Sequence, residues 1–397
     1  MFTKAYIPYR GYYSSPFSKW QGSFANEHSL ILGSKTAKEW LASRNIAPDT
    51  FDYLILGATV GQPQMFYGGP WTSALIGAQN IPGMLVSQAC STSTTAIFQA
   101  AMGVETGNFE NVFTLMTDKC SNGPHTIWPN PKGPGGQVIS ENWVMDHFNN
   151  DPWAKNAMIQ TAENVANESG VTREQCDDLA LRRAEQYADA LANDKAFQKK
   201  YMFPVSIQVS RKKSIEITTD EGIMPTTKEG LENLRPVLPD GAHTFGSQTH
   251  PADGNCALIV TTKDNAANLS QNSTKDAQII SYGFSRAKKG FMAMAVVPAA
   301  QMALDRASIS INDVKVIKTH NPFAANDIYL ADQMKIDVNS FNNFGSSLIF
   351  GHPQAPTAGR LIIEGIEELA DKGGGYMLFT GCAAGDTGAA LILKIDA

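Results

Sequence analysis

Apolar and polar positions along this chain predict one helix–strand plan that occurs twice. In residues 34–56, apolar side chains recur at helical spacing, and a short apolar strand follows at 53–56. Residues 297–317 have the same order, because a helix with alanine and leucine on one face leads to a strand at 314–317. A unit that is used twice predicts two similar α/β halves.

A second helix–strand pair is expected in each half. The helix at 96–107 ends on Gly107 and leads to a strand at 112–116. The helix at 360–371 is followed by three glycines and a strand at 376–379. Glycine directly after a helix is a frequent stop signal, because it adopts the left-handed conformation that closes the last turn. Two matches in the same order indicate a duplicated architecture.

The segment between the two halves has a different character. Residues 121–241 begin with a loop rich in proline and glycine and continue with a long helical stretch at about 154–192, which contains a helix start at 172–174. We therefore expect residues 1–120 with 242–270 to form the first half and residues 271–397 to form the second. The intervening segment is expected to be an inserted loop domain that packs over the core as a cofactor-binding cap.

Composition and charge exclude several classes of function. The chain has 397 residues, of which 43% are hydrophobic, and this suits a soluble enzyme of two or three domains. Its net charge of −6 without a basic block argues against a nucleic-acid partner. The N-terminal residues lack the apolar run of a secretory signal, and the longest apolar run, 291–304, is too short to cross a membrane. We therefore expect a cytoplasmic protein without a membrane partner.

The five cysteines favour neither a disulfide framework nor a metal site. Their number is odd and no Cys-x-x-Cys spacing occurs among them. A reducing compartment fits this pattern best. Cys120, Cys176 and Cys256 lie in no motif and are expected to be structural. The histidines outside any motif are likewise expected at the surface or in turns: His28, His125, His147 and His243.

Cys90 lies where a thiol is expected to become a nucleophile. An apolar strand-like run ends before it, and hydroxyl residues at 91–95 lead into a segment of helix formers. A cysteine at a helix start faces unpaired backbone N–H groups and the positive end of the helix dipole. Both effects favour the thiolate and predict a pKa below the usual value of about 8.5. The alternative is a small buried hydrophobic residue.

Three polar clusters in the second half are candidate acid–base partners for Cys90. His320 and Asn321 follow one predicted strand, Cys382 follows another, and His352 lies in a Gly-His-Pro turn before a helix. All three clusters are expected at the carboxyl ends of strands, where α/β proteins place their active sites. Each cluster alone is equally typical of a turn or of packing.

Together, these segments resemble the thiolase family. Residues 157–166 are similar to its Met-x-x-Thr-Ala-Glu-Asn motif, and residues 246–254 are similar to its Gly-Asn-Ala-Ser-Gly-x-x-Asp-Gly motif. Cys90 with its helix, residues 351–353 and residues 381–385 complete five motifs in the family's order, over essentially the whole chain. The resemblance implies a five-layered α-β-α-β-α thiolase fold of two similar halves, with the inserted loop domain as a CoA-binding cap.

The resemblance also implies a catalytic cycle. Cys90 would attack the 3-keto carbon of a 3-oxoacyl-CoA while His352 accepts the thiol proton. Cys382 would protonate the departing enolate and later deprotonate the incoming coenzyme A. The same residues run in reverse would perform a Claisen condensation. Coenzyme A is therefore the expected co-substrate, with no bound cofactor and no metal.

Charge develops on two oxygens in this reaction, so two oxyanion sites are expected. The backbone N–H groups of the nucleophile and of Ala384, in the loop with Gly385, would form one of them. The catalytic base and the 320–321 cluster would form the other. There, His320 would donate to the oxyanion and Asn321 would orient a water.

The chain departs from the family pattern at positions that shape the substrate channel. Residues 320–323 read His-Asn-Pro-Phe where the common motif is Asn-Glu-Ala-Phe. This histidine-first version is similar to the His-Asp-Cys-Phe of sterol-carrier-type thiolases, without its cysteine. Ala157 replaces a histidine, Thr249 a serine and His250 a glycine. The expected contacts of coenzyme A are Met158, Leu238, Phe245, Thr249 and His250.

The resemblance leaves assembly and substrate open. A homodimer or a dimer of dimers is expected, and one alternative is a catalytic subunit that needs a small accessory subunit with an OB fold or a zinc ribbon. The 2-benzoylsuccinyl-CoA thiolases of anaerobic aromatic degradation are of this kind, and the aromatic segment 66–71 makes a bulky acyl group a candidate. A non-catalytic acyl-CoA-binding protein and a cysteine hydrolase are alternatives from other classes.

Overall fold

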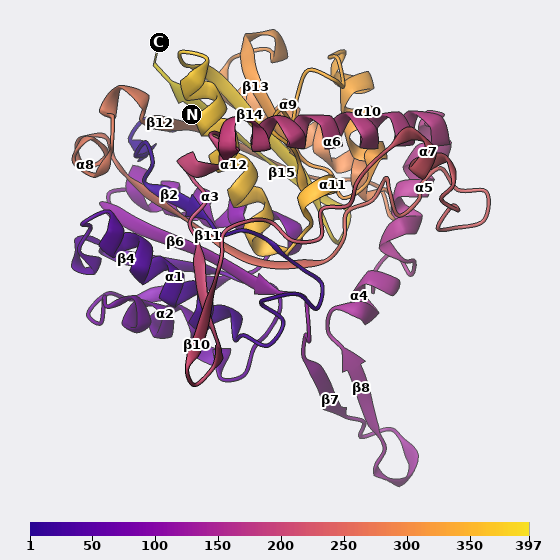
Figure 1. Ribbon diagram of the computed structural model, residues 1–397, viewed down its shortest axis with the longest axis horizontal. Helices are drawn as coiled ribbons and strands as arrows, with labels where there is room; N and C mark the ends of the chain where they lie inside the picture. Colours follow the sequence, from indigo (N-terminus) through magenta and orange to yellow (C-terminus); the bar gives the residue numbers. More distant parts are fainter. Residues whose placement is uncertain (397) are drawn as a thin grey trace.

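The strands of the two predicted halves join in one mixed sheet in the computed structural model, which describes residues 1–396 (Figure 1). The order across the sheet is β13 (Val314–His320), β14 (Gly375–Ala383), β15 (Thr387–Ile395), β12 (Ala277–Arg286), β1 (Ala5–Ile7), β11 (Ala252–Thr262), β6 (Asn111–Lys119), β4 (Tyr53–Gly57) and β5 (Gly83–Val86). The short strands β2 (Tyr12–Ser14) and β3 (Ser18–Lys19) also pair with β11. Because β1 pairs with both β11 and β12, it links the two halves.

The duplicated plan expected from the sequence is present. In the first half, β4 runs parallel to β6, and β6 is antiparallel to β11. In the second half, β13 runs parallel to β14, and β14 is antiparallel to β15. The helices that precede β4, β6, β13 and β14 are, in that order, α1 (Ser29–Ser43), α3 (Thr92–Glu105), α9 (Val296–Ala307) and α12 (Ala355–Asp371).

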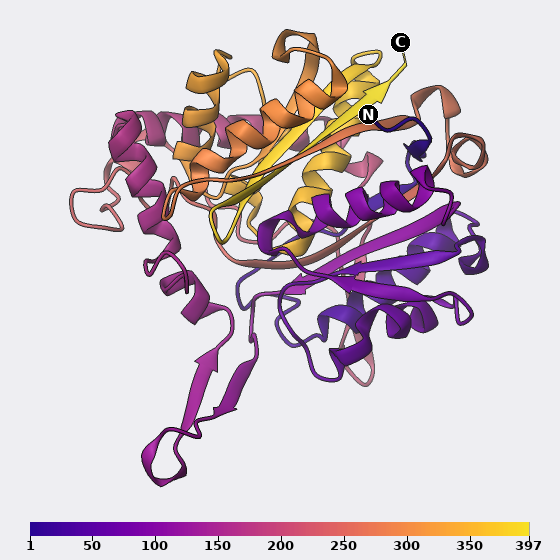
Figure 2. The same cartoon turned by 180° about the vertical axis from the view of Figure 1, so that it is seen from behind.

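Helices form three of the five layers (Figures 1 and 2). In the middle, α3 packs against α12, and α12 contacts β6 and β11 of the first half as well as β13 and β14 of the second. The outer helices are α1 and α2 (Gly68–Ile76) on the first half, and α9 and α10 (Ala324–Met334) on the second. This α-β-α-β-α order confirms the predicted fold class.

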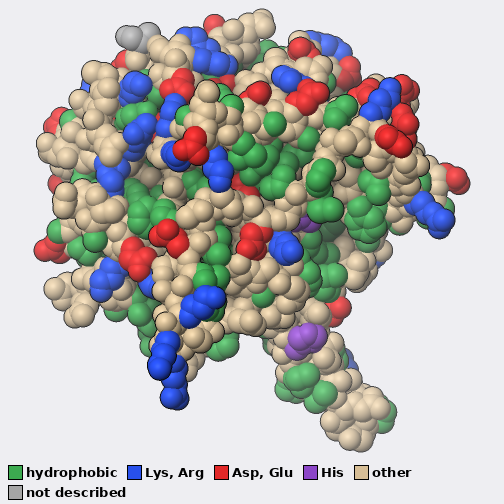
Figure 3. Space-filling view, in the orientation of Figure 1, with side chains coloured by type: hydrophobic (Ala, Val, Ile, Leu, Met, Phe, Trp, Pro, Cys, Tyr) green, Lys and Arg blue, Asp and Glu red, His purple; other side chains and the backbone are tan. Residues whose placement is uncertain are grey.

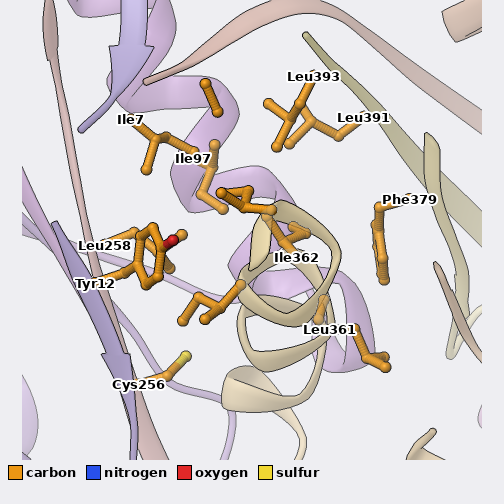
Figure 4. Close-up of a cluster of buried hydrophobic side chains, with 14 of the residues drawn as sticks. Ile7, Tyr12, Ile97, Cys256, Leu258, Leu361, Ile362, Phe379, Leu391 and Leu393 are labelled. Atoms are coloured by element: carbon orange, nitrogen blue, oxygen red, sulfur yellow. The ribbon is translucent and has the colours of Figure 1, made fainter. Parts of the chain in front are cut away.

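The largest apolar core lies between the two halves (Figure 4). Ile97 of α3 and Ile362 of α12 lie with Leu258 of β11 and Leu391 of β15 in this core, and all four are fully buried. Full burial of such a side chain stabilises the fold by about 1.5–3 kcal/mol. The core fixes α3 against α12, and the site residues lie at the starts of these two helices.

Three helices begin earlier than the sequence pattern indicates. The first residue of α1 is Ser29 rather than residue 34, that of α3 is Thr92 rather than 96, and that of α12 is Ala355 rather than 360. Hydroxyl residues in the first turn of α3 are buried, so tertiary packing extends this helix beyond its strong helix formers. Pro356 lies in the first turn of α12, where its missing N–H removes no helical hydrogen bond.

The long helical stretch predicted in the inserted segment is two helices. The first, α5 (Met158–Ser169), ends at Gly170, whose φ of 67° is left-handed. The second, α6 (Arg173–Lys195), begins at a capping box in which Thr172 and Gln175 each accept the backbone N–H of the other. A left-handed glycine and a cap therefore divide a segment that helix propensity alone would leave continuous.

The rest of the inserted segment includes a projecting hairpin (Figure 1). It consists of β7 (His125–Pro129) and β8 (Val138–Asn142) and carries exposed hydrophobic side chains, which appear green in Figure 3. The remaining elements of the chain are α4 (Met145–Asn149), β9 (Val205–Ser210), β10 (Lys213–Ile217), α7 (Lys228–Glu232), α8 (Lys263–Leu269) and α11 (Ser347–Phe350). Within residues 1–396, no helix is both long and apolar enough to cross a membrane.

Candidate active site

Cys90 lies in a single helical turn, residues 89–91, directly before α3. The Thr92 hydroxyl accepts from the Gln88 N–H at 2.8 Å and donates to the Ala89 carbonyl at 2.7 Å. Ala89 has a φ of 46°, in the left-handed region that residues other than glycine seldom adopt. The hydroxyl cluster thus shapes a tight turn that places Cys90 at a helix start, as the sequence predicted.

His352 lies against the sulfur of Cys90. Its Nε2 is 3.1 Å from Cys90 Sγ, and its Nδ1 is 2.6 Å from the Thr357 hydroxyl oxygen. The preceding residue, Gly351, has a φ of 89°, and a Cβ at this position would approach the His250 ring to 2.6 Å. Glycine therefore lets the Gly-His-Pro turn pack on the His250 loop, which holds the imidazole at the sulfur.

Burial, rather than the helix dipole, dominates the electrostatics of this pair. The surrounding protein raises the pKa of Cys90 to about 12, although the N–H groups of Ala384 and of Cys90 itself oppose the rise. Burial also lowers the pKa of His352 to about 3. The predicted thiolate is therefore wrong: thiol and imidazole are both neutral at neutral pH, because desolvation of the charged forms outweighs the two backbone donors.

Cys382 is buried at the end of β14. The Asn326 side chain donates to its sulfur at 3.1 Å. Burial raises the pKa of Cys382, and a negative charge on Cys90 raises it further, so the two sulfurs lie within electrostatic reach of each other. No motif indicated Asn326, which lies on α10 just after the 320–323 segment.

His320, at the end of β13, lies beside His352. The two ring centroids are 4.2 Å apart. The Nδ1 of His320 is 2.9 Å from the Ser347 hydroxyl, while its buried Nε2 has no hydrogen-bond partner in the part of the chain that the structure describes. Burial, and then the proximity of His352, lower the pKa of His320 well below its usual value. An imidazole with one nitrogen unpartnered in the described residues thus lies beside the Cys90–His352 pair.

The ligand atoms of Cys90, His320 and His352 all lie within 4.8 Å of one another. A thiol and two imidazoles in such a group could hold a metal ion. The spacing of the cysteines did not indicate this group, because its members come from three distant segments of the chain.

Asn321 faces a buried polar network rather than the sulfurs. Its side-chain nitrogen donates to Asp327 at 2.6 Å, and its oxygen accepts from the Ser347 hydroxyl at 3.1 Å. Asp327 also pairs with Arg183 at 2.9 Å. These contacts differ from the expected water-binding role, because both ends of the amide hold the His320 loop in place.

The backbone donors expected for one oxyanion act on the Cys90 thiol. The N–H groups of Ala384 and of Cys90 itself both lower the pKa of this thiol. Gly385 follows in the turn between β14 and β15 with a φ of 82°, and its carbonyl accepts from Arg286 at 3.2 Å.

Gln354 is a site residue that no motif indicated. Its Oε1 is 3.4 Å from Cys90 Sγ, and its backbone has the strained angles φ 62° and ψ −104°. The next residue, Ala355, donates its N–H to the buried Asp118 carboxylate at 2.9 Å. Asp118 also accepts from the Thr59 N–H, so it ties the loop after β4 to the loop that carries the base. The only feature of the sequence that could have indicated Gln354 as a site residue is its position directly after the Gly-His-Pro turn.

The residues expected to contact coenzyme A are spread over several positions. Thr249 is fixed in the site, because its N–H and hydroxyl donate to backbone carbonyls at 2.7 and 2.5 Å. Met158 packs against the apolar cluster that contains Cys382. Leu238 is half-buried, and Phe245 is 74% exposed. Thr249 and Met158 therefore lie near the catalytic groups, whereas Phe245 lies on the surface.

Known proteins share both the sequence pattern and the fold of this chain. Residues 11–264 match the family model "Thiolase, N-terminal domain", and residues 273–395 match "Thiolase, C-terminal domain". The human mitochondrial 3-ketoacyl-CoA thiolase is 26% identical over 391 residues and 96% of each chain. A Mycobacterium leprae protein described as "Probable acetyl-CoA acetyltransferase" is 28% identical over 386 residues, or 96% of this chain and 97% of the relative.

Solved structures agree with these matches. The crystal structure of human mitochondrial 3-ketoacyl-CoA thiolase in complex with CoA has a TM-score of 0.89 to this chain at 24% identity, and it covers 99% of this chain and 98% of that chain. This likeness confirms the fold. Because the two family models together cover nearly the whole sequence, the chain belongs to the thiolase family.

Proposed function

We propose that the protein cleaves or forms a 3-oxoacyl-CoA with coenzyme A through an acyl group on Cys90. Thiolases are acyl-CoA acyltransferases, and this chain is one of them. The contact of Cys90 Sγ with His352 Nε2 at 3.1 Å carries the assignment of residues. It unites a nucleophile with a base from the other half of the molecule, and we assign Cys382, whose pKa responds to charge on Cys90, as the second acid–base group.

In the first half-reaction, the Cys90 sulfur attacks the 3-keto carbon. The Nδ1–H of His352 donates to the Thr357 hydroxyl, so the Nε2 lone pair is free to take the thiol proton. Because thiol and imidazole are both neutral at rest, the proton moves as the S–C bond forms. The Cα–Cβ bond then breaks, and the Cys382 thiol protonates the carbon of the departing enolate.

In the second half-reaction, coenzyme A releases the acyl group. Cys382, now a thiolate, takes the proton of the CoA thiol, and the CoA sulfur displaces the Cys90 sulfur from the acyl carbon. The hydrogen bond that Asn326 donates stabilises the Cys382 thiolate between the two steps. His352 returns its proton to Cys90, so both cysteines end the cycle as thiols.

Two sets of donors would stabilise the oxyanions. The N–H groups of Cys90 and Ala384 form the first set. His352 and His320 form the second, because their rings lie side by side next to Cys90. One such donor is worth roughly 10²–10³ in rate. We assign Asn321 to the positioning of the His320 loop.

The CoA-binding surface is assigned to the inserted segment 121–241 and the loop that follows it. Residues 1–120 with 242–270 and residues 271–397 are the corresponding halves of the core. The half-buried Met158 and Leu238 offer apolar contact for a pantetheine chain. The remaining proposed contacts are Phe245, Thr249 and His250. A related structure, that of the human mitochondrial enzyme, is a complex with CoA, which supports CoA as the ligand.

The assembly is proposed to be a homodimer. The strand β5 is an edge of the sheet, and exposed side chains lie on it and on the neighbouring turn, namely Leu85, Phe66 and Tyr67. An unpaired edge with apolar side chains suits pairing with a second copy. The exposed apolar side chains of the β7–β8 hairpin suit a dimer of dimers. Activity of a lone homodimer would count against an accessory OB-fold or zinc-ribbon subunit.

A cytoplasmic location is also proposed. All five cysteines of the chain lie within residues 1–396, and each of them is free. Free thiols persist in a reducing compartment, where structural disulfides are rare.

A thiolysis screen tests the proposed reaction. The purified protein is given coenzyme A and 3-oxoacyl-CoA thioesters with straight, branched, aryl or dicarboxylic acyl groups. We expect consumption of coenzyme A in step with formation of two shorter CoA thioesters for at least one class. Release of free acid without coenzyme A would indicate a cysteine hydrolase. Binding of every class without turnover would indicate a non-catalytic acyl-CoA-binding protein.

A further inference from the structure

One thiol and two imidazoles of this chain form a cluster with the composition of a zinc site. The ligand atoms of Cys90, His320 and His352 lie within 4.8 Å of one another, and Cys90 Sγ is 3.1 Å from His352 Nε2. Tetrahedral zinc, with Zn–S near 2.3 Å and Zn–N near 2.0–2.1 Å, requires ligand separations of roughly 3.3–3.6 Å. The Cys90–His352 pair would widen by about 0.4 Å, and a pair at the 4.8 Å limit would close by about 1.2 Å, to reach this geometry.

The hydrogen bonds around both imidazoles leave a lone pair for a metal. Ser347 donates its hydroxyl proton to Asn321 Oδ1 at 3.1 Å, so its oxygen accepts the Nδ1–H of His320 at 2.9 Å. The Nε2 of His320 then carries a lone pair, and this buried atom is unpartnered within residues 1–396. In His352, the Thr357 hydroxyl hydrogen-bonds to Nδ1. The Nε2 atom therefore keeps its lone pair and lies against the Cys90 sulfur. Metal-binding histidines are usually held by their second nitrogen in this way.

We propose that this cluster binds one Zn²⁺ ion through Cys90 Sγ, His320 Nε2 and His352 Nε2, and that the bound ion inhibits the enzyme. On binding, the S–H bond breaks, the proton passes to solvent and an S–Zn bond forms. A fourth position is left for water, as in open zinc sites. The bound ion would occupy the sulfur and the nitrogen that acyl transfer uses, so zinc and substrate exclude each other.

The ligand set itself suits zinc, because thiolate and imidazole are its usual protein ligands. The third ligand exists because residue 320 is histidine, where the common family motif has asparagine.

A second cysteine–histidine pair provides a matched control. Cys176 Sγ is 3.9 Å from His243 Nε2. That nitrogen accepts from the Ala325 N–H at 3.3 Å, and Nδ1 contacts Glu163 at 3.1 Å, so neither nitrogen of His243 is free for a metal. We therefore expect that zinc does not bind to Cys176 and His243.

Metal titration of the resting protein, without any CoA thioester, tests the site. Metal-free protein is titrated with Zn²⁺ against a chromophoric chelator, and with Co²⁺ to detect a thiolate-to-metal absorption band. We expect one Zn²⁺ per chain, protection of Cys90 from alkylation, and loss of turnover that a chelator reverses. His320→Asn should weaken zinc binding by about 100-fold or more. Cys90→Ala should remove the cobalt band, and Cys176→Ser should change neither result.

Specific outcomes would overturn the site. One is an equal zinc affinity of wild type, His320→Asn and Cys90→Ala. Another is the loss of zinc binding in Cys176→Ser. The third is failure of the wild-type protein to retain zinc in competition with the chelator. Thermal unfolding separates a lost site from a lost fold, since zinc should raise the melting temperature of wild type and Cys176→Ser only. If His320→Asn does not fold, His320→Gln replaces it as the variant that lacks the third zinc ligand. Because binding is measured without turnover, a failed thiolysis screen would leave this result intact.

Discussion

The chain contains two cysteine–histidine pairs, and one of them is arranged for chemistry. Cys90 Sγ lies 3.1 Å from His352 Nε2, and Cys176 Sγ lies 3.9 Å from His243 Nε2. Burial raises the pKa of both thiols to about 12. Acidity of the thiol therefore does not distinguish a nucleophile from a structural cysteine in this protein.

Access and the use of the imidazole do distinguish them. Cys90 is partly exposed, whereas Cys176 is buried. Both ring nitrogens of His243 are engaged, one by a backbone N–H of α10 and the other by Glu163 of α5. His352 is held only at Nδ1 and keeps Nε2 for the sulfur. A reactive pair thus needs a free basic nitrogen and an open sulfur, which a short distance alone does not provide.

The largest expected effect separates the two cysteines. Cys90→Ala should lower kcat by on the order of 10⁶, because it removes the nucleophile on which both half-reactions depend. Cys176→Ala should leave kcat of the folded protein unchanged. Steady-state thiolysis of the preferred 3-oxoacyl-CoA measures both. A similar loss in the two variants would remove the distinction between the pairs.

Substitution of His352 should affect catalysis, whereas substitution of His243 should affect stability. His352→Ala should lower kcat by about 10²–10⁴, the usual contribution of a positioned general base, with little change in the free energy of unfolding. His352→Gln is a control of similar size that retains a polar side chain and no basic nitrogen. Recovery of normal turnover in the glutamine variant would show that His352 is needed for packing rather than for proton transfer.

His243→Ala should act on stability instead. The change leaves the Glu163 side chain and the Ala325 N–H short of a partner in a buried place, which costs about 1–3 kcal/mol. Urea unfolding should show this loss in the free energy of unfolding, while kcat of the folded fraction stays normal. A stable but inactive variant would instead assign His243 to the chemistry.

A further difference between the two cysteines concerns pH. With the pKa of Cys90 near 12, the thiolate fraction should rise about tenfold per pH unit through the neutral range. Alkylation of Cys90 by iodoacetamide should follow this rise without a plateau between about pH 6 and 9. Cys176 has an equally raised pKa but is buried, so it should stay unmodified in the native protein. A plateau that begins below the usual thiol pKa would instead indicate a preformed ion pair of Cys90 with His352.

Periodic features of the chain could be predicted, because they depend on local spacing. The strands expected at 53–56 and 376–379 lie within β4 and β14, and the helices before them are present. The helix starts were less accurate, because burial against other layers extends α3 and α12 beyond their strong helix formers. His243 was expected at the surface or in a turn. It lies in a loop but is fully buried, because this loop packs between α5 and α10.

The site could be predicted only where a motif carried it. Cys90 and His352 were found through family motifs, and the structure brings them into contact. Gln354 and Asn326 are single polar residues without a pattern, and their contacts with the sulfurs join segments that are 264 and 56 residues apart. The pKa of Cys90 was predicted in the wrong direction for a related reason. A helix start is visible in the sequence, whereas the desolvation that outweighs it comes from tertiary packing.

Peptide mapping by mass spectrometry tests the central claim most directly. The protein is incubated with its preferred 3-oxoacyl-CoA in the absence of free coenzyme A, quenched and digested. The account predicts one acyl group per chain, on Cys90 and not on Cys176. Added coenzyme A should remove this acyl group, and the group should form more slowly in His352→Ala. An acyl group on another residue, or turnover without any acyl group on Cys90, would contradict it.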